Sequence, residues 1–553
     1  MRNVEEKFNE WLARSTDPEV NEQLARLASD EKARTNAFYK DLEFGTGGLR
    51  GELGAGTNCL NVYTIRKVTQ GIADCLKTHG SKKAAISYDS RINSELFAVT
   101  AAEVFAANGI RTFLTKELMP TPYLSYITRK TGADAGVMIT ASHNPARYNG
   151  YKVYGADGCQ LTDDGALEMI GYINKIDPFD VVTLSLEDYL KSGMVEYVSD
   201  DVTAAYLDEV FARRTAYAEG LNVTYSPLNG TGYKLVPEIL KRMKVSRLDI
   251  VQEQSMPDGH FPTCPYPNPE KAEALKLGLK CAASNDSDIL IATDPDCDRV
   301  GIAVRTQEGM KLMTGNEVGV LLSDYLLMRK KANGTLPDKP VIVKTIVTTE
   351  LVRKVAAPYG AEIKDVLTGF KYIGDVIGKL EKKGEENRYV LGFEESYGYL
   401  SGTYVRDKDG VNASMLVAEM AAYYKAQGKT LVDRINEIYA LYGLYEHKLI
   451  TYEFAGAEGH DKMESLLKAL RQHLPKEIAG SAVTRSVDYL TQTEADLPRS
   501  DVLSFFTEDG SQLVIRPSGT EPLIKVYLTA CKDKKYNENK FALMKKELDA
   551  IFA

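Results

Sequence analysis

The chain has 553 residues, of which 44% are hydrophobic and 26% charged, and its formal net charge is −9. This length predicts roughly three or four domains, and the composition excludes a disordered or membrane-spanning protein. Acidic and basic residues are interspersed, so the charge gives no reason to expect a nucleic-acid partner.

The cysteines and the N-terminus indicate the compartment. Seven cysteines are scattered along the chain without a C-x-x-C pair, which is typical of reduced thiols. The charged, amphipathic N-terminus lacks the apolar core of a signal peptide, and no apolar run is long enough to cross a membrane. We therefore expect a cytoplasmic protein that does not associate with membranes.

The elements in chain order predict an α/β protein. Residues 1–40 are expected to form two helices that act as a packing arm, because "STDPEVNEQLARLA" supplies a cap, an early proline and an acidic first turn. Short apolar runs then alternate with amphipathic helical stretches, which predicts α/β domains with largely parallel sheets. The final segment, which includes "DVLSFFTEDGSQLVIRPSGTEPLIKVYLTA", alternates at strand period and predicts a separate α+β unit. The expected divisions are an arm at 1–40 and domains at 41–200, 201–312, 313–445 and 446–553.

The first loop with chemical potential follows the apolar run Val137–Ile139, in "GVMITASHNPARYNGYK". Ser142 and His143 are adjacent there, as in an acyl-transfer site. In an extended loop adjacent side chains point in opposite directions, so we expect His143 not to take the proton of Ser142 as a triad base does. The chain also has no G-x-S-x-G elbow. The alternative is a capped turn in which Ser142 and Asn144 bond their own backbone.

A second loop, "ATDPDCDRVG", carries Asp294, Asp296 and Asp298 at two-residue spacing. Three carboxylates on one side of an extended segment repel one another unless a cation joins them, and oxygen-only ligands favour Mg²⁺. An EF-hand is excluded because Arg299 stands where the loop needs glycine and Arg305 where it needs glutamate. The sequence therefore predicts a site for Mg²⁺ or another hard cation in preference to an Asp-rich surface turn.

Four further loops are weaker signals when each is taken alone. "RPSGTEPLIKVY" predicts a phosphate cradle of hydroxyls, backbone N–H groups and flanking cations, and "EFGTGGLRG" places Arg50 at the end of a glycine-rich turn. "GFEESYGY" offers carboxylates and a hydroxyl suited to sugar hydroxyls, although it is also consistent with an exposed acidic loop. "LTGFKYIG" contributes Lys371, which is more often a solvated lysine than a catalytic one.

Together these loops resemble the α-D-phosphohexomutase family of phosphoglucomutases and phosphomannomutases. The similarity covers nearly the whole chain, with "FGTGGLRG", "TASHNP", "DPDCDR", "TGFKYIG", "FEESYG" and "RPSGTEP" in the family order. The resemblance implies four domains around a central cleft, three similar α/β domains with mixed sheets and a smaller C-terminal α+β domain. It also implies a cytoplasmic isomerase of carbohydrate metabolism, a monomer or weak homodimer that acts on sugar phosphates.

The resemblance further implies a phosphoserine mechanism. Glucose 1-phosphate and glucose 6-phosphate would interconvert through glucose 1,6-bisphosphate, with Ser142 as the phosphoryl carrier and one Mg²⁺ per chain held by Asp294, Asp296, Asp298 and the serine phosphate. The implied catalytic residues are Ser142, His143, Arg50, Lys152 and Lys371. The implied substrate-binding residues are Arg299, Gly369, Glu394, Ser396, Arg516, Ser518, Gly519, Thr520 and Lys525.

Several alternatives stay open at this point. Phosphomannomutase-type members have a histidine in the sugar loop where this chain has Gly398, so the loop is similar to the glucomutase type. Phosphopentomutase or phosphomannomutase activity, and a glucose 1,6-bisphosphate synthase, would use the same loops. A non-catalytic sugar-phosphate-binding protein would need only the phosphate cradle and the sugar loop, with no use for Ser142, the carboxylates and Arg50 together.

Overall fold

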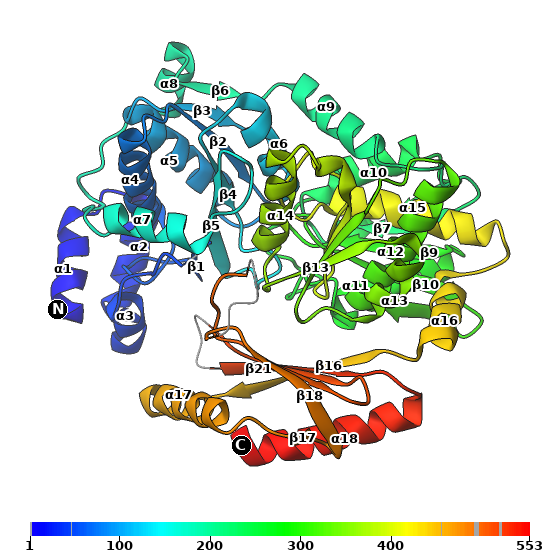
Figure 1. Ribbon diagram of the computed structural model, residues 1–553. Coiled ribbons are helices and arrows are strands. Elements are labelled where there is room, and N and C mark those ends of the chain that lie inside the picture. Colours follow the sequence, from blue (N-terminus) through cyan, green and yellow to red (C-terminus); the bar gives the residue numbers. More distant parts are fainter. Residues whose placement is uncertain (1–2, 46, 455, 492–496, 519–522, 553) are drawn as a thin grey trace. The chain divides into compact units, whose positions relative to one another are not determined.

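A computed structural model describes residues 3–45, 47–454, 456–491, 497–518 and 523–552 (Figure 1). The chain forms two compact units. The first contains Met1–Ile342 and Phe370–Leu431, and the second contains Val343–Gly369 and Val432–Ala553. No helix in the described ranges is both long and apolar enough to span a bilayer.

The N-terminal arm contains three helices, so the expectation of two was wrong. They are α1 (Val4–Arg14), α2 (Pro18–Leu27) and α3 (Glu31–Phe38). The third begins where the Asp30 side chain accepts a hydrogen bond from the Ala33 N–H, a cap that offsets its weak amphipathicity. Trp11 is 3% exposed and packs edge-on against Phe38 and Tyr63, which joins the arm to the first sheet's helices.

The first sheet has six strands in the order β1-β5-β4-β2-β3-β6. Strands β4, β2, β3 and β6 are parallel to one another, whereas β5 and β1 are antiparallel additions at one edge. The sheet is therefore mixed, with a parallel part and an antiparallel edge. The strands are β1 (Gly48–Glu52), β2 (Lys83–Tyr88), β3 (Arg111–Leu114), β4 (Ala135–Ile139), β5 (Tyr148–Gly155) and β6 (Val195–Tyr197). The helices are α4 (Val62–Thr78), α5 (Ser94–Ala107), α6 (Thr121–Thr131), α7 (Asp163–Ile173) and α8 (Leu186–Ser192).

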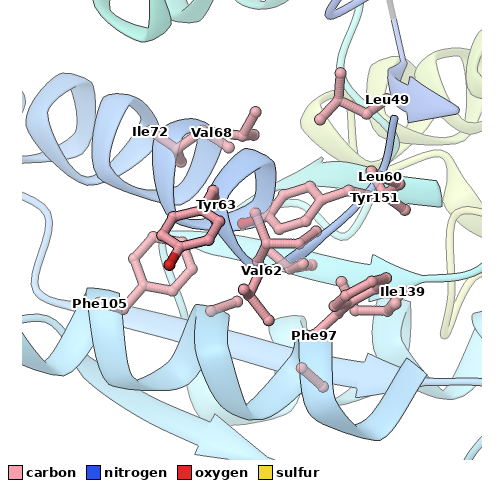
Figure 2. Close-up of a cluster of buried hydrophobic side chains, with 14 of the residues drawn as sticks. Leu49, Leu60, Val62, Tyr63, Val68, Ile72, Phe97, Phe105, Ile139 and Tyr151 are labelled. Atoms are coloured by element: carbon pink, nitrogen blue, oxygen red, sulfur yellow. The ribbon is translucent and has the colours of Figure 1, made fainter. Parts of the chain in front are cut away.

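The core of this sheet is packed between its strands and helices α4 and α5. Figure 2 shows Val68 and Ile72 of α4, Phe97 and Phe105 of α5, and Tyr151 of β5 gathered in one apolar cluster. Each of these side chains is 3% exposed or less, so the sheet edge that carries β4 and β5 rests on a rigid base.

The second sheet repeats this plan in the order β11-β10-β9-β7-β8. Strands β9, β7 and β8 are parallel, and β10 and β11 are antiparallel additions next to β9. Its strands are β7 (Asn222–Ser226), β8 (Arg247–Ile250), β9 (Ile289–Thr293), β10 (Val300–Thr306) and β11 (Gly309–Met313). Its helices are α9 (Asp200–Phe211), α10 (Gly232–Arg242) and α11 (Ala272–Ser284), with a short 3₁₀ turn η1 (Gln252–Gln254).

The rest of the first unit contains a third antiparallel hairpin, β14 (Tyr389–Glu394) and β15 (Gly398–Leu400). The buried helix α15 (Gly410–Lys425) follows it directly. Helices α12 (Gly315–Ala332) and α14 (Phe370–Lys382) and the 3₁₀ turn η3 (Glu386–Arg388) complete this part. The division between the units falls inside β12 (Val341–Thr345) and again at α16 (Leu431–Tyr442).

The second unit is dominated by a six-stranded sheet in the order β16-β21-β20-β19-β18-β17, in which every pairing is antiparallel. This confirms the α+β character predicted for the end of the chain. Its strands are β16 (Glu446–Glu453), β17 (Glu477–Ile478), β18 (Ser481–Asp488), β19 (Leu503–Thr507), β20 (Gln512–Pro517) and β21 (Leu523–Ala530). The remaining elements are α13 (Leu351–Ala356), η2 (Ala357–Tyr359), β13 (Glu362–Val366), α17 (Gly456–Gln472) and α18 (Lys534–Phe552).

Candidate active site

Ser142 lies in the loop between β4 and β5, at the carboxyl end of a parallel strand. Its φ of 52° is left-handed, and its N–H donates to Thr140 Oγ1 at 2.7 Å. The side chain is buried, and Oγ lies 3.2 Å from His143 Nδ1. The expectation that the two neighbours point apart was wrong, because the turn at Ser142 is not extended.

The buried side chain of Arg91 binds the backbone of this loop. Its guanidinium donates to the carbonyl oxygens of Ser142 at 2.5 Å, Pro145 at 3.0 Å and Tyr148 at 2.9 Å, and also to that of Asn144. The side chain has no exposed surface. A single cation therefore satisfies the inward-facing carbonyls of a turn that has no regular strand partner.

Two further groups fix Arg91 itself. Asp89 Oδ2 is 3.5 Å from Arg91 Nε, and the ring of Phe261 lies 5.1 Å from the guanidinium carbon. Burial raises the pKa of Asp89 despite the neighbouring Arg91 charge. The Ser142 loop thus depends on a buried ion pair.

The three carboxylates predicted to bind metal lie together in the loop between β9 and β10. Ligand oxygens of Asp294, Asp296 and Asp298 are within 4.8 Å of one another, and all three side chains are buried. Ser142 Oγ donates to Asp294 Oδ2 at 2.9 Å. The fold therefore brings the serine of the first sheet to the carboxylates of the second.

The residues present fit a hard divalent cation. Asp296 Oδ1 and Asp298 Oδ1 are buried without a hydrogen-bond partner. Burial and the charge of Asp296 raise the pKa of Asp294 and of Asp298, so the carboxylates are mutually destabilised when no cation is bound. Oxygen-only donors with unsatisfied lone pairs are the set that Mg²⁺ prefers.

Lys152 and Thr121 complete the surroundings of Asp296. Lys152 Nζ is 2.9 Å from Asp296 Oδ2 and 3.9 Å from Asp298 Oδ2, and Thr121 Oγ1 donates to Asp296 Oδ2 at 2.8 Å. Burial acts to lower the pKa of Lys152, but the two carboxylates outweigh it and the pKa is raised. In this arrangement Lys152 is a cation.

His143 is half-buried next to Ser142, and its pKa is shifted toward the neutral form. Burial, and then the charge of Arg299, lower its pKa well below the ordinary value. A neutral imidazole next to Ser142 Oγ can donate or accept a proton there.

A third hairpin loop, between β14 and β15, joins this group. An isolated bridge pairs Arg299 with Gly398, and the Val300 N–H donates to the Tyr397 carbonyl at 2.9 Å. Lys408 Nζ lies 3.0 Å from Asp298 Oδ2. The Ser142 loop, the aspartate loop and this third loop each join two antiparallel strands: β4 to β5, β9 to β10 and β14 to β15. The candidate residues therefore occupy equivalent positions in the three hairpins.

Gly398 is required by the approach of Lys408. A Cβ at this position would lie 2.1 Å from Lys408 Cδ, and the Lys408 ammonium is anchored to Asp298 and, at 3.1 Å, to Asp407. A larger side chain could enter only if the methylene groups of Lys408 shifted.

The other predicted residues of the first unit lie at varied positions. Arg50 is exposed on β1, opposite Gly150 of β5. Glu394 is buried at the end of β14 and its charge acts on Lys408 and Arg299, while Ser396 lies in the turn that follows. Lys371 is the second residue of α14, and its ammonium pairs with Asp163 at 2.7 Å.

The phosphate loop belongs to the second unit. Arg516 of β20 and Lys525 of β21 are directly opposite each other, so two cations lie side by side on neighbouring strands. The Ser518 N–H donates to the Leu523 carbonyl at 2.8 Å. Gly519 and Thr520 lie outside the described residues. Gly369, also in this unit, has a φ of 119°, a conformation that favours glycine.

Sequence reasoning missed four residues: Arg91, Lys408, Thr121 and Asp407. "YDSR" directly after an apolar run, and "RDKDG" between a strand and a helix, were available as signals because charged residues at strand ends often line a site. The partners of Arg91 are backbone carbonyls, which no residue type reveals.

Comparison with known proteins finds similarity along most of the chain. Four models match in order: Phosphoglucomutase/phosphomannomutase alpha/beta/alpha domain I at residues 41–179, domain II at 204–309, domain III at 314–442 and the C-terminal domain at 457–544. A curated relative from Staphylococcus aureus, named phosphoglucomutase, is 35% identical over 535 residues, which is 94% of each chain.

Solved structures agree with this fold. Parafusin, a phosphoglucomutase from Paramecium, has a TM-score of 0.70 at 19% identity and covers 93% of this chain and 94% of its own. An N-acetylphosphoglucosamine mutase from Aspergillus fumigatus, solved with GlcNAc-6P and magnesium, has a TM-score of 0.50 at 15% identity, covering 97% and 100%.

Proposed function

Because the chain belongs to the phosphoglucomutase/phosphomannomutase family, we propose that it is a phosphoglucomutase that uses Ser142 as its phosphoryl carrier. It interconverts α-D-glucose 1-phosphate and D-glucose 6-phosphate through glucose 1,6-bisphosphate. The observation that carries this proposal is the contact of 2.9 Å between Ser142 Oγ and Asp294 within the buried carboxylate cluster. We place the domain boundaries at 41–200, 201–312, 313–445 and 446–553.

The carrier avoids release of phosphate to water. Phosphate monoesters hydrolyse very slowly without catalysis, so a covalent phosphoserine divides the transfer into two direct steps. The phosphoryl group leaves Ser142 Oγ for a sugar hydroxyl, and the bisphosphate returns its other phosphoryl group to the same oxygen. The left-handed turn held by Arg91 keeps Oγ in place for both steps.

Asp294, Asp296, Asp298 and the phosphate on Ser142 would hold Mg²⁺, which would polarise a phosphoryl oxygen. Lys152 and Lys408 contribute positive charge next to Asp296 and Asp298. Arg50 would neutralise charge that develops on the transferred group.

Each transfer also moves a proton. The attacking sugar hydroxyl loses one, and Ser142 Oγ regains one when it leaves. His143 Nδ1 is 3.2 Å from Ser142 Oγ, and burial lowers the pKa of His143. We therefore propose that His143 exchanges the proton with Ser142 Oγ. Lys371 is the candidate for accepting the proton of the sugar hydroxyl, because Lys152 is already a cation paired with Asp296 and serves to balance charge.

In the first unit, we assign Glu394, Ser396 and Arg299 to binding of the sugar hydroxyls. In the second unit, we assign the role of substrate binding to Gly369 and the role of phosphate binding to Arg516, Ser518, Gly519, Thr520 and Lys525.

Glucose is the substrate that the sugar loop favours. A phosphomannomutase-type histidine in place of Gly398 would require the methylene groups of Lys408 to shift. The competing assignments are phosphopentomutase, phosphomannomutase and glucose 1,6-bisphosphate synthase, which differ in substrate or donor. A non-catalytic sugar-phosphate-binding protein would have no use for the serine–carboxylate contact.

The test compares the wild-type enzyme, Ser142→Ala and the control Ser465→Ala, whose serine is exposed on α17. Intact-mass measurement should find phosphate on the wild type and the control, and none on Ser142→Ala. With glucose 1,6-bisphosphate as primer, kcat/KM should be highest for glucose 1-phosphate among the glucose, mannose and ribose 1-phosphates. Undiminished turnover by Ser142→Ala would refute the mechanism, and a preference for ribose would indicate a pentomutase.

A further inference from the structure

A second group of metal-binding side chains lies in the first unit, on the helix pair α4 and α7. Cys75 and His79 are four residues apart at the end of α4, and Glu168 lies on α7. One ligand atom from each lies within 4.8 Å of the other two. His79 Nε2 is 2.8 Å from Glu168 Oε1. The proposed mutase reaction uses none of the three residues.

The two helices hold these residues at a set separation. Gly71, Cys75 and His79 succeed one another at four-residue intervals, so they share one face of α4. On that face Gly71 packs directly against α7, because a Cβ there would lie 2.5 Å from the Ile173 Cα. Such close backbone packing leaves little freedom for the next two turns of the same face to move relative to α7.

The ligand types select the metal. A cysteine sulfur and an imidazole suit Zn²⁺, which binds sulfur, nitrogen and carboxylate oxygen, whereas Mg²⁺ prefers oxygen alone. A thiolate and a carboxylate carry two negative charges, which a divalent cation neutralises. The His79 and Glu168 side chains are 57% and 48% exposed, so an ion can reach them from solvent.

A cysteine binds metal as the thiolate, so binding displaces a proton from the Cys75 sulfur to solvent. The new metal–sulfur bond replaces the sulfur–hydrogen bond.

We propose that Cys75, His79 and Glu168 form a Zn²⁺ site that links the C-terminal end of α4 to α7. Water occupies the fourth position. Because these ligands meet only in the folded domain, binding stabilises the folded chain.

The test uses the full chain, freed of metal and then saturated with Mg²⁺ so that the aspartate site is filled. Zn²⁺ affinity is measured by competition with a chromophoric chelator, and Co²⁺ is added in parallel because a thiolate ligand gives a sulfur-to-cobalt charge-transfer band. We expect one Zn²⁺ per chain, a rise in Tm and the charge-transfer band. His79→Gln, a change at an exposed residue, should weaken Zn²⁺ binding more than about tenfold, since loss even of a group outside the ligand shell costs that much.

Matched controls separate this site from chance binding. Cys281→Ser and His473→Gln remove a partly buried cysteine and an exposed histidine elsewhere, and should bind Zn²⁺ as the wild type does. Cys75→Ser should lose the charge-transfer band. His79→Gln should keep its mutase activity with Mg²⁺. Equal Zn²⁺ affinity in the wild type and His79→Gln, or a cobalt spectrum without the sulfur band, would overturn the proposal.

Discussion

Replacing Arg91 by methionine should destabilise the first unit and impair catalysis together. The change leaves Asp89 buried beside an apolar side chain and removes the donor shared by four loop carbonyls. Breaking a buried ion pair costs about 3–5 kcal/mol. Each hydrogen bond from a charged donor contributes about 1.5–3 kcal/mol, but protonation of Asp89 and relaxation of the loop recover part of this loss. We therefore expect the free energy of unfolding to fall by about 3–5 kcal/mol.

The catalytic effect is separated from folding by Arg91→Lys. Lysine keeps the charge beside Asp89 but cannot reach all four carbonyls, so the loop should shift while the domain remains folded. A displacement of about 1 Å at a reacting atom can lower the rate by about 100-fold. We expect kcat to fall by that order with little change in KM, because Arg91 contacts the Ser142 loop.

The assay combines urea unfolding with steady-state kinetics. Arg147→Met is the matched control, since Arg147 lies in the same loop but is exposed and pairs with Glu52 at the surface. It should change neither quantity measurably. If Arg91→Met unfolds at the wild-type urea concentration and turns over at the wild-type rate, the hydrogen bonds of Arg91 do not hold the Ser142 loop in place.

Three further predictions follow from particular contacts. Asp296→Asn should weaken Mg²⁺ activation by removing one of three charges, measured as the Mg²⁺ concentration for half-maximal activity; an unchanged value would exclude Asp296 as a ligand. Trp11→Ala should cost about 3–5 kcal/mol because it empties the site between Phe38 and Tyr63, and loss of the packing should appear in circular dichroism melts. Burial, and then the charge of Lys344, lower the pKa of His447 to about 4 from 6.5. Between these two pKa values the folded chain binds fewer protons than the unfolded chain. The stability that the neutral His447 contributes is therefore fully present above pH 6.5, and the free energy of unfolding falls by up to about 3 kcal/mol as the pH falls toward 4. His447→Asn should flatten the pH dependence of urea unfolding in that window, and an unaltered slope would contradict the assignment.

Much of the site could be predicted because its residues are grouped in short motifs. The three aspartates occupy alternate positions of one loop, and the repulsion among them follows from spacing alone. The conformation of Ser142 could not be predicted in this way. The left-handed turn at Ser142 has its carbonyl oxygen bound by Arg91, which lies 51 residues earlier and donates its hydrogen bonds in this loop to backbone carbonyls.

The prediction of largely parallel sheets was incomplete, because the first two sheets also contain antiparallel strands. Apolar runs predict strands but not their direction, and the antiparallel additions after β4 and β9 are set by short hairpin connections. Those hairpins place the loops of the first two sheets at equivalent ends. The third helix of the arm was missed because its cap, and not its hydrophobic pattern, defines it.

The sequence by itself predicted where the chemistry lies: three alternating carboxylates suited to a hard cation, and cations beside the "RPSGTEP" segment. Local spacing was sufficient for these two predictions, whereas the role expected of Ser142 followed from the resemblance of six motifs in order to a known family. Only the tertiary structure decided the contacts that make one site of them. Ser142 meets Asp294 across 152 positions of the chain, Lys152 meets Asp296 across 144, and Lys408 reaches Asp298. Such pairings arise from the packing of separate sheets, and the ammonium groups of Lys152 and Lys408 offset part of the cost of burying the Asp296 and Asp298 charges.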